Sequence, residues 1–238
     1  MNALDVEAIE KWFPTPSGEP RLVLRIDYLS IATGEHVALR GASGCGKTTL
    51  LHVIAGIIAA DAGRVLVAGR KMPRPFEAER DRVRASSIGY VFQSFNLLEA
   101  YTALENVALG MSFGTRVDVA RACELLERMG LGACLHHRPS QLSVGQQQRV
   151  AIARAIAARP ALVLADEPTG NLDPAAAQTA VRLMRDVCRE IGAALLIVSH
   201  DERVLGHFDR CLDLETLNVA NRRNEKSDLH EGRMRAEA

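Results

Sequence analysis

The sequence predicts an α/β fold with a phosphate-binding loop and an inserted helical subdomain. Residues 41–49 read GASGCGKTT, which fits the pattern G-x-x-x-x-G-K-[ST]. Strand-like and helical segments alternate toward both ends of the chain, the arrangement of a layered α/β core. Between about residues 95 and 150 the pattern is helical instead, which indicates an insert in that core.

The glycine-rich segment has the composition that phosphate binding requires. Gly41, Gly44 and Gly46 let the backbone turn tightly and point its N–H groups at an anion. The helix that follows adds the positive end of its dipole. We expect Lys47 near the β- and γ-phosphates and the Thr48 hydroxyl on magnesium. The alternative is a glycine-rich turn that fits by chance, and the flanking strand and helix argue against it.

Composition excludes several classes of protein. The 238 residues carry 29 Lys and Arg against 29 Asp and Glu. The chain therefore lacks the net positive charge that is typical of proteins that bind nucleic acid. The longest apolar runs are far too short for a bilayer span, and the first residues do not resemble a signal peptide. We therefore expect a cytosolic protein.

The coarse secondary structure follows from periodicity and from turn residues. Strands are expected at Leu22–Ile26, His36–Leu39, Arg64–Gly69, Ile88–Phe92, Ala161–Ala165 and Ala193–Val198. Helices are expected at Thr49–Ala55, at Val117–Met129, from near Gly145 to Ala158, and from Asp173-Pro174 to Gly192. The helix over Val117–Met129 should bury one face, made of Val119, Ala122, Leu125, Leu126 and Met129.

Two carboxylates follow the strand at 161–165 directly. Asp166 and Glu167 then lie at the carboxyl edge of the sheet, where open α/β sheets bind ligands. Asp166 suits a magnesium shell, and Glu167 suits a base that activates water for attack on a γ-phosphate. A surface Asp-Glu pair opening a loop is the alternative, and the nearby phosphate loop makes it the weaker one.

Residues 142–150, LSVGQQQRV, form a second informative segment. A Ser-x-Gly-Gln turn that opens a helix offers a hydroxyl, a free amide and a helix dipole to an anion. Taken alone, it is equally an ordinary capped helix start.

Together these residues resemble the ATP-binding cassette (ABC) family over nearly the whole chain. Segment 41–49 matches the Walker A motif, 162–166 with Glu167 matches Walker B and the catalytic glutamate, and 142–146 matches the signature motif. Gln93 matches the Q-loop glutamine, Asp173 the D-loop aspartate and His200 the switch histidine. The resemblance implies a phosphate-loop NTPase core of ABC ATPase type with an N-terminal antiparallel β part.

The resemblance also implies roles for individual residues. Catalysis would fall to Glu167, His200 and Lys47. ATP would be held by Phe13, Gly41, Ser43, Gly44, Cys45, Gly46, Lys47, Thr48, Thr49 and Gln93, and Mg2+ by Thr48, Gln93 and Asp166. Ser143, Gly145 and Gln146 would contact ATP bound to a second subunit, with Asp173 nearby, so that a homodimer buries two ATP molecules.

Two positions depart from the family pattern. Val144 replaces the usual glycine of the signature, but the Ser143 hydroxyl and the next amide remain. The aromatic residue that stacks on adenine is either Phe13, the better match, or Trp12. Residues 211–218 also lack the Asp-Gly turn that relatives often have there, which suggests a shortened or altered last strand.

Segments 142–155 and 165–173 look most like the branch of lipoprotein-releasing, macrolide-exporting and FtsE-type ATPases. This implies a peripheral ATPase on the cytoplasmic face of the inner membrane, held there only by an integral membrane permease that docks near residues 94–101. Two alternatives remain: an FtsE-like ATPase that signals to a cell-wall hydrolase without transport, and a soluble ABC ATPase. Neither the transported substrate nor its direction can be inferred.

These expectations give three parts. Residues 1–94 and 151–220 form the ATP-binding core, and residues 95–150 form the helical subdomain with the signature. The charged residues 221–238 form a tail that we expect to be disordered.

Overall fold

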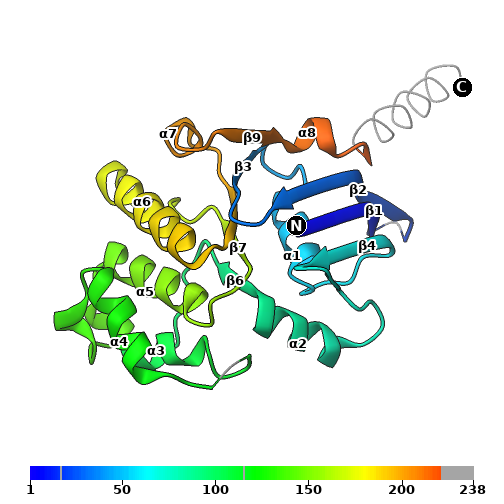
Figure 1. Cartoon of the computed structure of the whole chain (residues 1–238). Helices are drawn as coiled ribbons and strands as arrows, with labels where there is room; N and C mark the ends of the chain where they lie inside the picture. Colours follow the sequence, from blue (N-terminus) through cyan, green and yellow to red (C-terminus); the bar gives the residue numbers. More distant parts are fainter. Residues whose placement is uncertain (17, 115, 221–238) are drawn as a thin grey trace, which may run out of the picture.

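A computed structural model describes residues 1–16, 18–114 and 116–220, which form two sheets and a group of helices (Figure 1). The antiparallel sheet has the order β2-β1-β4-β5 and the parallel sheet the order β6-β7-β8-β3-β9. The strands are β1 (Asn2–Pro14), β2 (Pro20–Ala32), β3 (His36–Arg40), β4 (Ala62–Val67), β5 (Arg70–Lys71), β6 (Ile88–Val91), β7 (Leu162–Asp166), β8 (Ala194–Val198) and β9 (Arg210–Asp213). The helices are α1 (Lys47–Ile54), α2 (Glu77–Ser87), α3 (Ala103–Leu109), α4 (Val119–Arg128), α5 (Val144–Ile156), α6 (Pro174–Ile191), α7 (Glu202–Leu205) and α8 (Leu214–Leu217).

The first strand was not predicted, and a β-bulge explains why. Val6 and Ile9 are both buried although they are three positions apart, which breaks the period of two that identifies a strand. The pairing of β1 with β4 shifts register between Glu7 and Glu10, and Ala8 has a left-handed φ of 47°. The bulge therefore hides the strand from a search for simple alternation.

The predicted strands β2 and β3 belong to different sheets. β2 pairs antiparallel with β1, whereas β3 pairs parallel with β8 and β9. The turn at Thr33-Gly34-Glu35 therefore leads the chain from one sheet into the other (Figure 1).

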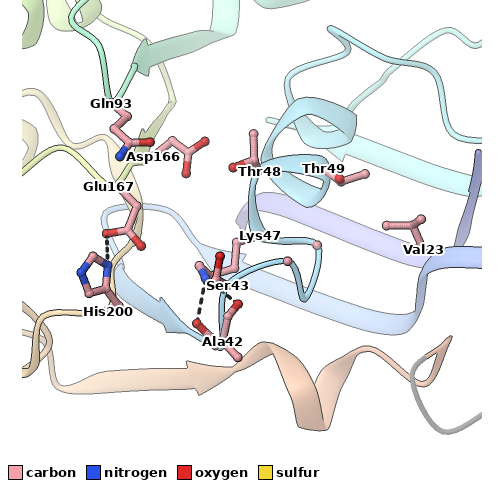
Figure 2. A pocket seen from close by; sticks show the side chains of 13 residues that line it. Val23, Ala42, Ser43, Lys47, Thr48, Thr49, Gln93, Asp166, Glu167 and His200 are labelled. Atoms are coloured by element: carbon pink, nitrogen blue, oxygen red, sulfur yellow. Dashed lines mark hydrogen bonds and ion pairs between the residues drawn. The ribbon is translucent and has the colours of Figure 1, made fainter. Parts of the chain in front are cut away.

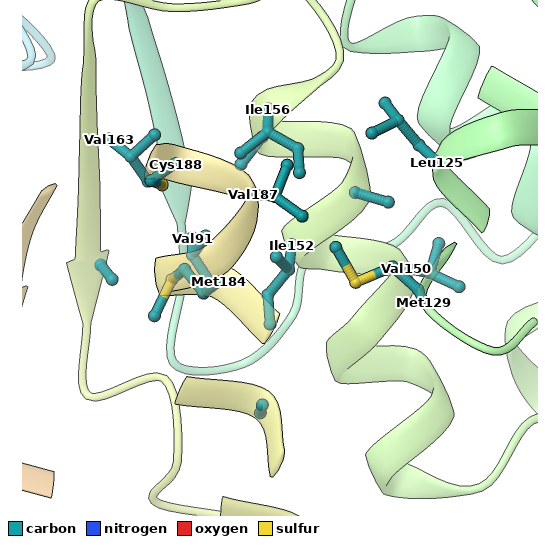
Figure 3. Packing of buried hydrophobic residues seen from close by; sticks show 14 of the residues in the cluster. Val91, Leu125, Met129, Val150, Ile152, Ile156, Val163, Met184, Val187 and Cys188 are labelled. Atoms are coloured by element: carbon teal, nitrogen blue, oxygen red, sulfur yellow. The ribbon is translucent and has the colours of Figure 1, made fainter. Parts of the chain in front are cut away.

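The parallel sheet separates two apolar cores. On β7, Val163 and Ala165 face the core shared with α3 to α6, part of which Figure 3 shows. Leu162 and Leu164 face the core shared with α1 and the antiparallel sheet. Because every residue of β7 is buried, the strand reads as an unbroken apolar run that ends at Asp166.

The predicted helices are present, with one difference in burial. Ala122, Leu125, Leu126 and Met129 of the α4 region are buried as expected, but Val119 is 54% exposed. Val119 is the first residue of α4, directly after its Asp118 cap, and the buried stripe begins one turn later.

The boundaries of the ATP-binding core, the helical subdomain and the charged tail remain predictions. Residue 150 lies inside α5, so the helix that begins in the 95–150 segment continues into the core segment. Residues 221–238 lie outside the described part of the chain. Within the described residues, none of the helices combines the length and the apolar character that a membrane span needs.

Candidate ATP-binding site

The phosphate loop connects the end of β3 to the start of α1. Gly46 is the N-cap of α1 and has a φ of 104°. A Cβ at Gly46 would lie 2.9 Å from Cδ2 of Leu24, and a Cβ at Gly41 would lie 2.7 Å from Sγ of Cys45. Gly46 is therefore favoured by its backbone angle, whereas a side chain at Gly41 would require the Cys45 side chain to shift.

The loop forms one wall of a cleft of about 580 Å³ (Figure 2). Opposite it lie side chains from three segments that are distant in the sequence. The cleft is lined by Val23, Gly41, Ala42, Ser43, Gly44, Gly46, Lys47, Thr48, Thr49, Gln93, Asp166, Glu167 and His200. The fold thus gathers most of the predicted ATP-binding and catalytic residues around one space.

Lys47 lies folded over its own loop. Its Nζ donates hydrogen bonds to the carbonyl oxygens of Gly41 (2.7 Å) and Ala42 (2.8 Å). These bonds hold a positive charge against the phosphate loop, which is a favourable setting for a polyphosphate.

Asp166 is the buried carboxylate of the site, 7% exposed. Burial raises its pKa, while a hydrogen bond from the Thr48 hydroxyl opposes that shift. A buried carboxylate beside a hydroxyl offers oxygen ligands of the kind that Mg2+ prefers, so the residues present fit this cation.

Glu167 and His200 form a hydrogen-bonded pair at the cleft. Oε2 of Glu167 lies 2.9 Å from Nδ1 of His200 (Figure 2). The Glu167 side chain is 13% exposed, whereas that of His200 is 73% exposed. Glu167 also has a left-handed φ of 44°, an uncommon conformation for a glutamate.

Gln93 follows β6 and is exposed at the cleft. Its backbone carbonyl accepts a hydrogen bond from Nδ2 of Asn171 (3.1 Å). This bond links the segment after β6 to the turn that precedes α6.

Several predicted residues do not line the cleft. The Cys45 side chain is buried beneath the loop, and burial raises its pKa. Phe13 lies on β1, with Nζ of Lys11 5.4 Å from its ring centre. Asp173 caps α6 through the N–H groups of Ala175 and Ala176.

The predicted signature residues also lie away from the cleft, at the start of α5. The Ser143 side chain accepts a hydrogen bond from the Gln146 N–H, and the Gln146 side chain accepts one from the Ser143 N–H. Ser143 is exposed, and Val144 beside it is 47% exposed. This capping box presents its hydroxyl and the helix end to the outside of the chain.

Two lining residues were not among the predicted sites. Ala42 occupies a position where the loop pattern accepts any residue, so the pattern does not mark it. Val23 belongs to β2, and no motif marks it, because its place at the cleft follows from how the antiparallel sheet packs on the loop.

Comparison with known proteins places this geometry in a family. Residues 24–170 match the ABC transporter family. The lipoprotein-releasing system ATP-binding protein LolD 2 of Caulobacter vibrioides is 43% identical over 89% of this chain and 94% of its own length. A LolD protein of Maricaulis maris is 45% identical over 88% of this chain and 92% of its own length.

Solved structures agree with this assignment. The dimeric ATP-binding cassette MJ0796, in a post-hydrolysis state bound to ADP and Pi, superposes with a TM-score of 0.81. It is 34% identical and covers 91% of this chain and 95% of its own. The chain belongs to the ABC transporter family, and it is an ATP-binding, ATP-hydrolysing subunit of that family.

Proposed function

We propose that the cleft binds ATP with its phosphates on the loop of residues 41–49. The observation that carries this is the convergence of Lys47, Thr48, Asp166, Glu167 and His200 on one space. Lys47 would exchange its bonds to the loop carbonyls for bonds to the β- and γ-phosphates. Thr48, Asp166 and Gln93 would hold Mg2+, which supplies charge neutralisation for the phosphates when bound.

Glu167 is the proposed general base. A water placed between its carboxylate and the γ-phosphorus would lose a proton to Glu167 as it attacks, and ADP would leave. The hydrogen bond to His200 fixes the carboxylate at Oε2 and leaves Oε1 for the water. His200, an exposed side chain that lines the cleft, is proposed to contact the γ-phosphate.

The site is proposed to be completed by a second copy of this chain. Ser143, Gly145 and Gln146 lie outside the cleft of their own chain and offer a hydroxyl and a helix N-terminus to an anion. A two-fold arrangement would bring them to the γ-phosphate of the partner, with Asp173 near the same junction. The dimeric state of the related cassette supports this assembly.

Phe13 is the proposed adenine-stacking residue. It is half-buried at the end of β1, on the sheet that also supplies Val23 to the cleft. Trp12, the alternative, points its indole Nε1–H to Glu10 at 3.3 Å.

A membrane permease is the proposed partner, and the loop after Gln93 its docking surface. Leu98 and Tyr101 are 42% and 43% exposed there. The guanidinium group of Arg154 on α5 holds this loop by donating hydrogen bonds to the carbonyl oxygens of Phe95 (2.7 Å) and Asn96 (2.6 Å). Exposed apolar side chains on a supported loop suit a helix that packs against them.

The relatives named as lipoprotein-releasing ATP-binding proteins favour lipoprotein release as the process that this ATPase drives. We propose that the chain itself lies at the cytoplasmic face of the inner membrane. The test is to purify the Glu167→Gln form from solubilised membranes with ATP and to identify what accompanies it. We expect a stoichiometric polytopic membrane protein with a lipoprotein-binding extracytoplasmic region. Association with a cell-wall hydrolase or its activator would favour the FtsE-like alternative, and no membrane partner would favour a soluble ABC ATPase.

Docking can be tested in the same preparation. Leu98→Asp should abolish co-purification, whereas Tyr28→Asp, a 58% exposed aromatic residue on β2, should retain it. Retention of the partner by the Leu98 variant would exclude this loop as the contact.

A further inference from the structure

The segment after β9 contacts the phosphate loop from outside the cleft. β9 runs beside β3, with Asp213 opposite Arg40, the residue that precedes the loop. Nε of Arg40 donates to Oδ2 of Asp213 at 3.1 Å. Oδ1 of Asp213 accepts the N–H of Glu215 at 2.9 Å and so caps α8. Asp213 therefore orients both the start of the loop and the short helix beside it.

Glu215 makes a direct bond to the loop. Its Oε1 accepts a hydrogen bond from the backbone N–H of Ala42 at 3.1 Å. Leu214 is fully buried next to it, close enough that a Cβ added at Gly41 would lie 3.4 Å from its own Cβ. A carboxylate and an apolar contact thus fix the first turn of the loop.

Asn218 fixes the other side of the loop. Its side chain is fully buried, and Nδ2 donates to the carbonyl oxygens of Cys45 (3.3 Å) and Val23 (2.8 Å). Its Oδ1 accepts from the N–H of Arg25 at 2.8 Å. One amide therefore joins the loop to the strand that supplies Val23 to the cleft.

We propose that Asp213, Leu214, Glu215 and Asn218, which we call the loop brace, hold the phosphate loop in its nucleotide-binding shape, and that Glu215 is the positioning residue that sets ATP affinity. The inference rests on the proposed ATP site. A loop that binds phosphate through successive N–H groups gains affinity when those groups are fixed beforehand. Glu215 is the part of the brace that can be changed without disturbing the core, because its side chain is exposed.

The electrostatic contribution of Glu215 opposes its geometric one. A carboxylate beside the loop repels a polyphosphate, and its charge already contributes to the raised pKa of the Cys45 thiol. Removing the hydrogen bond should weaken ATP binding, whereas removing only the charge should not. Ala and Gln substitutions separate the two effects, because the Gln side chain keeps an acceptor oxygen.

The experiment compares Glu215→Ala, Glu215→Gln and Thr216→Ala in the full chain. Thr216, exposed on the same turn, is the matched control. We expect Glu215→Ala to raise KM for ATP about three- to tenfold with kcat within about twofold, the range of one exposed hydrogen bond. Glu215→Gln should give the wild-type KM or a lower one, and Thr216→Ala the wild-type value.

A second readout needs no nucleotide. Backbone amide exchange at Ala42 should be faster in Glu215→Ala than in wild type and unchanged in Thr216→Ala. An unchanged exchange rate together with an unchanged KM in Glu215→Ala would overturn the brace, and so would a Gln variant as weak as the Ala variant. Failure of wild type to bind ATP would instead overturn the proposed function, since the exchange result does not depend on nucleotide.

Discussion

Nδ1 of His200 lies 2.9 Å from Oε2 of Glu167, and the two residues come from the ends of neighbouring strands. Glu167 follows β7 and His200 lies two residues after the end of β8. The backbone N–H of Glu167 also donates to the carbonyl oxygen of Val198 at 3.0 Å, so β8 positions both ends of the glutamate. The sheet pairing itself thus orients the proposed base.

Replacing Glu167 with Gln should abolish turnover and leave ATP binding intact. The amide keeps the shape of the side chain but accepts no proton, and loss of a general base costs about 10²- to 10⁴-fold in rate. Steady-state ATPase activity and equilibrium nucleotide binding measure the two properties, with Glu202→Gln on α7 as the exposed control. Turnover within a few-fold of wild type would remove Glu167 from the role of base.

Replacing Lys47 with Ala should weaken ATP binding by about tenfold or more, because a charged hydrogen bond to phosphate is lost. Lys71→Ala, an exposed lysine on β5, is the control for general loss of positive charge. Equilibrium binding of a fluorescent ATP analogue decides the outcome. Equal affinities in the two variants would place Lys47 outside the phosphate site.

Gly46→Ala should lower both stability and nucleotide affinity. The left-handed φ of 104° strains any residue with a Cβ, by about 1–3 kcal/mol, and the added carbon meets Leu24. Gly130→Ala is the matched control, since Gly130 has a φ of 70° with no atom within 4 Å of an added Cβ. Thermal unfolding should show a lower melting temperature for both variants, whereas nucleotide binding should be weaker only in Gly46→Ala.

Phe13→Ala should raise KM for ATP more than Trp12→Ala does. Loss of an aromatic residue under a base costs about 1–3 kcal/mol, or roughly 5- to 150-fold in affinity. KM for ATP and for a triphosphate without a base, measured in both variants, separates stacking from a general disturbance of β1. A larger effect of Trp12→Ala on ATP alone would transfer the stacking role to Trp12.

The sequence alone predicts the class of this fold because its signals are local. The glycine spacing of the loop, the apolar run of β7 and the Asp173-Pro174 cap each lie within a few residues. The assignment of β2 and β3 to different sheets is not local, because it depends on which strands β1 and β8 pair with. The bulge at Ala8 hides β1 for a similar reason, since the alternation resumes out of phase.

The residues of the site also divide into those that local sequence predicts and those that depend on contacts between distant segments. Asp166 and Glu167 can be predicted because they lie at and directly after the end of a buried strand, but the left-handed backbone of Glu167 and its bond to His200 depend on β8. The brace residues Glu215 and Asn218 carry no motif, and the missing Asp-Gly turn was the one sign that this end of the chain differs. Their contacts arise only once β9 is placed beside β3.

Helix α5 connects the serine proposed to contact the partner's nucleotide with the loop proposed to contact the permease. Ser143 caps its start, and Arg154, two residues before its last residue, holds the carbonyls of Phe95 and Asn96. A helix of 13 residues is a stiff rod of roughly 20 Å. If the proposed docking and dimer contacts hold, a displacement of the loop by the permease would be transmitted along α5 to the Ser143 hydroxyl at its other end.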